Sequence, residues 1–264
     1  MSVRCGAIVS SFLDGCRMAG SMFSMRRASF ASEAVDPRRR ELLQHALVHP
    51  AIEGLSGRAK ALPLGLRPVD ETLPEGGLPR GAVVEISAPQ GLARSTTLAL
   101  SLCASAQAEA RMRGESDTQG AFCAWLDPTS TLFAPAVARA GVDLGRLLVV
   151  RPNPEDLARV AVRVASSHAF AVVVVDTAGI PGNRGEGRLD RWVNVVRRLA
   201  LAVEGSDTTL LLLTDAAASR AMPLPTAMRI ELERLAEDRI GLRVAKDRRG
   251  RVTAPQTIDL PRTG

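Results

Sequence analysis

The stretch that decides the fold begins with a strand-like run, Val83–Ser87 (VVEIS), and leads into a helical pattern. The residues that connect the two are Ala88-Pro89-Gln90-Gly91-Leu92-Ala93-Arg94-Ser95. A strand, a loop of this length and a helix form the arrangement in which backbone N–H groups and a helix N-terminus bind phosphate. The order of these parts therefore predicts a phosphate-binding loop at residues 88–95.

The residues of this loop depart from the usual GxxxxGK[ST] sequence at three places. Glycine is expected at the first and sixth places and lysine at the seventh, whereas this chain has Ala88, Ala93 and Arg94. Alanine where the backbone needs positive φ costs on the order of 1 kcal/mol. Arg94 keeps the charge of lysine without its compact shape, and only the hydroxyl of Ser95 is retained. We therefore expect binding of ATP and Mg²⁺ to be weak or lost.

The chain around the loop alternates between strand and helix patterns. The strand candidates are continuous apolar runs, which is typical of strands buried on both faces of a parallel sheet. These strands are predicted at Ala82–Ser87, Ala121–Leu126, Leu147–Arg151, Ala171–Asp176 and Thr209–Thr214. Helices are predicted at Ser95–Arg113, Phe133–Ala140, Glu155–Ser167 and Leu189–Val203. The pattern predicts an α/β fold with a mainly parallel sheet sandwiched by helices.

The pattern changes after Pro225. Residues 228–233 alternate between apolar and polar, Ile240–Lys246 is the next strand candidate, and Asp247–Gly250 has the composition of a turn. We expect an antiparallel extension at the edge of the sheet, within a core that spans residues 62–264.

Two segments precede this core. Residues 1–35 contain no continuous hydrophobic region of the secretory kind. We interpret them as a disordered leader or a mis-assigned start, with an amphipathic targeting arm as the alternative. Residues 36–61 are interpreted as a helix and a linker, because Asp36 can cap a helix, Pro37 suits its first position and Pro50 stops it.

Composition sets limits on the function. The chain has 264 residues, of which 46% are hydrophobic and 23% charged, so it can form a full globular core. Its apolar runs are far shorter than the ~20 residues of a membrane span, and we expect a cytoplasmic protein. The net charge of +6 favours nucleic acid as a partner over a membrane. Cys103 and Cys123 have no metal-ligand spacing and are predicted to be core residues.

Asp176 ends the valine-rich strand 171–176 and is the second candidate for the phosphate site. A carboxylate at the end of a buried strand is placed to hold a magnesium ion, and Ser95 would be the other ligand. The alternative is an aspartate that caps the turn into Thr177.

Several segments occur in the order of a known family. They are Leu64–Asp70 (LGLRPVD), Gly76–Ile86 (GGLPRGAVVEI), Ala140–Leu148 (AGVDLGRLL) and Leu242–Gly250 (LRVAKDRRG). Together they resemble the core of RecA, a P-loop NTPase, over about residues 62–262. The resemblance implies DNA-binding loops at Ile180–Asp190 and Ala216–Pro225, with Arg184 and Arg188 as candidates for contact with the DNA backbone.

The chain departs from the RecA pattern where hydrolysis is carried out. The resemblance puts Thr129 in the place of the catalytic glutamate and Asp215 near the place of the glutamine switch. Without a carboxylate at 129, we expect no hydrolysis and predict no catalytic residue. The alternative is that Arg94 serves as the lysine and that Asp127 orients the attacking water.

A truncated RecA core with a degenerate loop resembles the ImuA family of bacterial translesion-synthesis accessory proteins. That resemblance implies a role in the DNA-damage (SOS) response, with an inactive Y-family polymerase-like protein and an error-prone DNA polymerase as partners. Leu43 and Ala46, in the helix predicted at 37–49, are candidates for docking RecA or a second copy. The alternative is a helix that packs on its own domain.

Three functions follow from these resemblances. The first is an accessory protein in DNA repair that acts by docking, with direct contact to single-stranded DNA left open. The second is an active DNA-dependent ATPase or recombinase of the RecA class. The third, which has less support, is a cell-division inhibitor of the SulA type.

Overall fold

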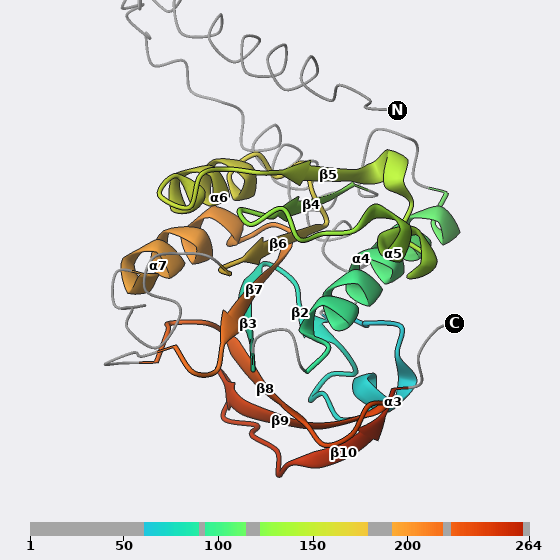
Figure 1. Cartoon of the computed structure of the whole chain (residues 1–264). Coiled ribbons are helices and arrows are strands. Elements are labelled where there is room, and N and C mark those ends of the chain that lie inside the picture. The colour runs from blue at the N-terminus through green and yellow to red at the C-terminus, as the bar shows by residue number, and fades with distance from the viewer. Residues whose placement is uncertain (1–60, 90–92, 115–121, 179–191, 219–222, 261–264) are drawn as a thin grey trace, which may run out of the picture. The chain divides into compact units, whose positions relative to one another are not determined.

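The computed structural model describes residues 61–89, 93–114, 122–178, 192–218 and 223–260 (Figure 1). The predicted leader, the helix at 37–49 and most of the two loops assigned to DNA lie outside these residues. Site candidates outside the described part stay predictions; they are Leu43, Ala46, Gln90, Gly91, Leu92, Arg184 and Arg188. The boundaries of the leader, the linker and the core also stay predictions.

The centre of the fold is an eight-stranded sheet with the order β10-β9-β8-β3-β7-β6-β4-β5. Six neighbouring strands, from β8 to β5, run parallel, and β9 runs antiparallel to both β8 and β10. The strands of this sheet are β3 (Ala82–Ala88), β4 (Cys123–Leu126), β5 (Leu147–Val150), β6 (Val172–Asp176), β7 (Thr209–Asp215), β8 (Met228–Arg234), β9 (Arg239–Asp247) and β10 (Gln256–Asp259). The predicted α/β class and mainly parallel sheet are confirmed.

Helices cover both faces of the sheet. In Figure 1, α6 and α7 lie to one side of the parallel strands, and α4 and α5 lie to the other. The helices are α3 (Arg67–Asp70), α4 (Ser95–Met112), α5 (Ala134–Arg139), the 3₁₀ turn η2 (Leu144–Arg146), α6 (Leu157–Ala165) and α7 (Trp192–Val203). Because the sheet lies between two helical layers, its central strands are shielded from water on both faces.

Alternate residues of the central strands pack into two separate apolar cores. Val172 and Val174 of β6 belong to the core on the α4 side, and Val173 and Val175 belong to the core under α6 and α7. All four valines are completely buried. Burial on both faces is why these strands have apolar sequences without alternation.

The predicted elements agree with the structure to within a few residues, with one difference in topology. The expected antiparallel extension is present, since β9 pairs antiparallel with β8 and β10, but β8 itself pairs with β3 in parallel, from Val84↔Met228 to Ser87↔Glu231. The antiparallel arrangement begins only at β9. A parallel connection must lead from the end of β7 back to the edge where the parallel strands begin. The chain between Asp215 and Met228 is long enough for such a crossover.

A small two-stranded antiparallel sheet of β1 (Ala61–Leu62) and β2 (Leu78–Pro79) precedes the main sheet and was not predicted. It requires Gly77, because a Cβ atom there would lie 2.4 Å from the carbonyl oxygen of Leu62. The GGLP segment therefore has a packing role at the entry to β3.

The two described cysteines are core residues, as predicted. Cys103 of α4 and Cys123 of β4 are completely buried and free, and the Cys123 thiol donates to the Cys103 carbonyl at 3.8 Å. Hydrogen bonding with Cys123 and burial both raise the pKa of the Cys103 thiol. Among the described helices, none has the length and hydropathy needed to cross a bilayer.

Candidate phosphate-loop site

The candidate site lies at the edge of the sheet where the parallel strands end. Ala88 ends β3, Asp176 ends β6 and Asp215 ends β7, and Ala88 is the register partner of Asp215. Asp127 follows the last residue of β4. Because parallel strands share one direction, these residues meet at one edge, as the α/β topology predicts.

The first residue of the phosphate loop is held by the strand beside it. Ala88 is 3% exposed, and its carbonyl accepts a hydrogen bond from the N–H of Ala216 at 3.0 Å. Ala93, at the far end of the loop, is 1% exposed. The two alanines that replace glycines therefore have methyl groups buried in the protein, where they contribute to packing.

Arg94 occupies the place of the usual lysine, but its side chain binds the protein itself. Its guanidinium donates one hydrogen bond to the carbonyl of Leu260 and another to the carbonyl of Glu237. Leu260 follows β10, and Glu237 lies in the turn between β8 and β9. Both segments reach this edge because β8 and β10 run in the direction of β3. Sequence reasoning did not identify this contact, since its acceptors are backbone atoms far along the chain.

Arg94 also has an unusual backbone conformation. Its φ is 57° and its ψ is 26°, in the left-handed region, directly before the first residue of α4. A non-glycine residue in this region costs on the order of 1 kcal/mol. Glycine precedes lysine in a standard loop, whereas here the left-handed residue is the arginine.

Ser95 and Asp176, the predicted magnesium ligands, lie on neighbouring elements. Ser95 is half-buried at the first position of α4, and α4 packs on β6, which ends in Asp176. Within the described part of the chain, no group of three or more His, Cys, Asp or Glu residues could hold a metal. The structure places both candidates but does not test their predicted role.

Asp176 forms the turn-capping contact that was the alternative interpretation. Its carboxylate accepts a hydrogen bond from the N–H of Ala178 at 2.8 Å. Burial raises the pKa of Asp176, and the negative charge of Asp127 raises it further, while the Ala178 hydrogen bond opposes both effects. Two carboxylates therefore face this edge of the sheet close enough to repel each other.

Asp127 binds the backbone of the turn that follows β4. Its carboxylate is completely buried and accepts hydrogen bonds from the N–H of Thr131 and the N–H of Leu132, both at 3.0 Å. The Arg151 guanidinium lies 3.7 Å away. Thr129, in the place of the catalytic glutamate, is exposed and offers a hydroxyl, which is not a base at neutral pH. This arrangement gives the turn around Asp127 a structural role.

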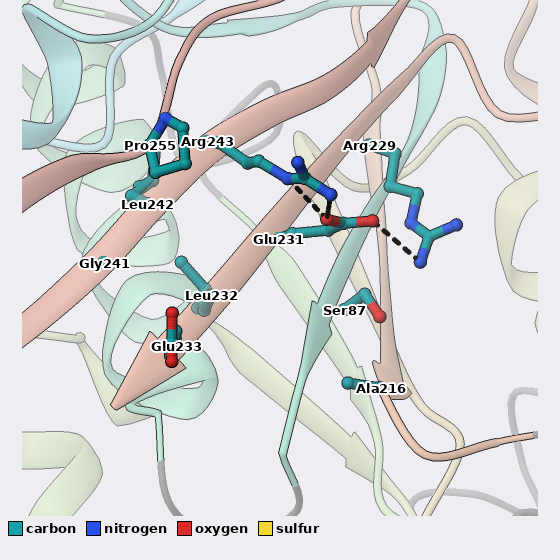
Figure 2. Close-up of a pocket in the computed structure, with 10 residues that line it drawn as sticks. All are labelled: Ser87, Ala216, Arg229, Glu231, Leu232, Glu233, Gly241, Leu242, Arg243 and Pro255. Carbon is teal, nitrogen blue, oxygen red and sulfur yellow. Dashed lines mark hydrogen bonds and ion pairs between the residues drawn. The ribbon is translucent and has the colours of Figure 1, made fainter. Parts of the chain in front are cut away.

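A chain of charged side chains behind the loop was not predicted. Glu85, in the middle of β3, is completely buried, and its carboxylate accepts from the Thr214 hydroxyl at 2.7 Å and lies 3.9 Å from the Arg229 guanidinium. Arg229 also pairs with Glu231 at 3.0 Å, and Glu231 pairs with Arg243 (Figure 2). The sequence held one sign of this chain of charges, because Glu85 is the single charged residue in the apolar run Val83–Ile86.

Arg229, Glu231 and Arg243 form one wall of a pocket of about 390 Å³ on the face of β8 and β9. Figure 2 shows Glu231 between Arg243 and Arg229, with Ser87 and Ala216 at one end of the pocket and Pro255 at the other. Since Ser87 directly precedes the phosphate loop, the pocket lies against the strand that delivers that loop. Three of its charged groups, Arg229, Glu231 and Arg243, pair with one another.

Comparison with known proteins gives a consistent result. The model of the RecA N-terminal domain family matches residues 53–199. RecA of Cutibacterium acnes is 31% identical over 167 residues, which cover 59% of this chain and 45% of the relative. RecA of Bifidobacterium breve is 31% identical over 182 residues, covering 62% and 43% respectively. RecA of Thermus thermophilus is 32% identical over 182 residues, covering 62% and 50%. This chain therefore spans about half the length of the curated relatives that it matches.

Proposed function

Since this chain belongs to the RecA N-terminal domain family, we propose that it has a role in DNA repair, as an accessory protein that docks partners and does not hydrolyse ATP. The observation that carries the proposal is the position of Arg94. The one cation of the phosphate loop donates its hydrogen bonds to Leu260 and Glu237. A nucleotide would have to compete with these contacts for the guanidinium.

The residues around the loop support the same conclusion. Hydrolysis of a nucleoside triphosphate needs a group that positions and activates water. Thr129 lacks a carboxylate, and the Asp127 carboxylate is occupied by the backbone of its own turn. The residues expected to bind a magnesium–nucleotide complex are retained to a greater extent than those expected to activate water. Ser95 supplies the hydroxyl and Asp176 the carboxylate at the two expected places. These residues support binding more than turnover.

The proposed partners follow from the resemblance to ImuA. We propose that the chain docks an inactive Y-family polymerase-like protein and an error-prone polymerase during translesion synthesis in the SOS response. Leu43 and Ala46 are the proposed contacts with RecA or a second copy, and Arg184 and Arg188 the proposed contacts with single-stranded DNA. These four residues lie outside the described structure, so the proposal rests on their place in the sequence.

One observation favours the alternative of an active DNA-dependent ATPase. Asp176 and Asp127 lie at the ends of adjacent parallel strands and interact electrostatically, and Asp176 has a raised pKa. Perturbed carboxylates at such an edge are common in catalytic sites. If the turn around Thr131 rearranges, Asp127 becomes available as a base.

ATP turnover by the purified protein, with and without single-stranded DNA, separates the two functions. We expect no turnover above that of the Asp176→Ala variant under either condition. DNA-stimulated hydrolysis that this variant abolishes would overturn the proposal and establish an active recombinase-class enzyme. Damage-induced mutagenesis in cells then tests the accessory role, since a strain lacking the protein is expected to lose it.

A further inference from the structure

Arg94 joins two segments that are distant in the sequence. We define the C-terminal strap as the turn 235–238 together with β10 and Leu260. The N–H of Leu260 donates to the carbonyl of Asp238 at 2.6 Å, so the two parts of the strap are bonded to each other. Leu260 is 4% exposed and belongs to the apolar core on the α4 side. The strap therefore closes over the start of α4, with Arg94 between the two.

The charge of Arg94 is poorly compensated in this position. No carboxylate of the described residues forms an ion pair with it, and its hydrogen bonds are with neutral backbone carbonyls. It also lies at the N-terminus of α4, where the helix dipole disfavours a cation. The left-handed backbone adds strain at the same residue. An anion beside Arg94 would relieve the electrostatic part of this cost.

From these contacts we infer that Arg94 is a latch, which holds the C-terminal strap against the phosphate loop and releases it when a polyphosphate recruits the guanidinium. A phosphate that accepts from the two N–H groups that now bond to the carbonyls of Leu260 and Glu237 takes them from the strap, so this mode of binding and the latched state exclude each other. The inference does not depend on the accessory role proposed above. It concerns how the loop and the strap are coupled, whether or not hydrolysis follows.

Besides Arg94, the strap is held by the buried side chains of Ile258 and Leu260, by one exposed ion pair and by backbone hydrogen bonds. The side-chain pair Arg239–Asp259, at 2.9 Å, is exposed at both ends. The remaining backbone bonds are those of an edge strand, β10 with β9. Release would expose the apolar side chain of Leu260 and the surface of α3, which contacts β10. A partner could then recognise a surface that is covered in the latched state.

Amide hydrogen exchange of the full-length protein tests the latch. The reporters are the amide of Leu260, which bonds to Asp238, and the amides of Leu235 and Ala236, which bond to the carbonyl of Arg239 at the start of β9. In Arg94→Gln we expect these amides to exchange roughly tenfold faster than in the wild type. Adding millimolar inorganic pyrophosphate to the wild type is expected to accelerate the same amides, and it should have no further effect in the variant.

Two controls keep the test specific. Arg239→Gln removes the exposed ion pair of the strap without touching the loop, and we expect it to change strap exchange by less than about threefold. The amides of Val173 and Val174 in β6 report whether the fold is intact and should stay unchanged throughout. Unchanged strap exchange in Arg94→Gln would refute the latch. Unchanged or slower exchange in the wild type with pyrophosphate would refute its release by anions, and needs no variant.

Discussion

The helix-covered half of the sheet and its C-terminal extension share an apolar core but differ on their other face. In β6 and β7 the interior residues are apolar, and Val174 and Leu211 are completely inaccessible to water. In β8 and β9 one face carries Arg229, Glu231 and Arg243, which pair with one another beside the pocket of Figure 2. The parallel strands of the family fold are therefore stabilised by apolar packing. The extension adds charged contacts on one face to the apolar packing of its other face, which buries Ile230, Leu242 and Val244.

The largest effect is expected in the helix-covered half. Leu211→Ala removes a completely buried side chain from the middle of β7, and we expect a loss of about 3–4 kcal/mol in the free energy of unfolding. Chemical denaturation measures it. Leu201→Ala on the surface of α7, 71% exposed, is the matched control and should cost less than about 0.5 kcal/mol. Similar losses in both variants would contradict the assignment of this half to apolar packing.

The charged chain behind the loop should respond to paired replacement. Glu85→Ala leaves Arg229 without its buried partner and Thr214 without an acceptor, and we expect a loss of about 3 kcal/mol. Glu85→Leu combined with Arg229→Met removes both charges and should recover most of that loss. Chemical denaturation of the two variants compares them. A double variant as unstable as Glu85→Ala would mean that the β3–β8 contact is not the source of the effect.

At the phosphate-loop edge of the sheet, the charged form of the Asp176 carboxylate is disfavoured. Burial and Asp127 raise the pKa of Asp176, so the folded state retains a proton that the unfolded state loses. Stability therefore falls as pH rises from the ordinary carboxyl pKa through the raised one. We expect Asp176→Asn to be more stable than the wild type at pH 7, by on the order of 1 kcal/mol. The difference should disappear below about pH 3. Thermal unfolding across this range measures it, and a gain that persists in acid would point to another cause.

The smallest effect is expected at the outer edge of the extension. Arg239 and Asp259 are 53% and 72% exposed, so water and salt screen their attraction. Arg239→Gln should change Tm by less than about 2 °C. Differential scanning calorimetry of the variant beside the wild type checks this. A larger shift in Tm would mean that the Arg239–Asp259 ion pair contributes strongly to holding the strap, and this would count against the role assigned to Arg94.

Much of the frame was predictable because burial leaves a direct trace in the sequence. The runs at 171–176 and 209–214 are short and continuously apolar, which is typical of strands buried on both faces. The order of strand-like and helix-like segments placed the loop at 88–95 between a strand and a helix. The family match over residues 53–199 confirms the resemblance to RecA. The parallel pairing of β8 was not predictable, because the alternation in 228–233 identifies a strand with one polar face but not its direction.

The sequence by itself determined the α/β class, the family and the loss of the usual loop residues, since each depends on local residue types in order along the chain. Only the tertiary structure decided what the replaced residues do. Arg94 meets Leu260 and Glu237 because parallel strands bring the ends of β3, β8 and β10 to one edge. Asp127 is occupied by the turn that follows it. Such contacts depend on backbone atoms brought together by the fold, and backbone acceptors leave no mark in a sequence.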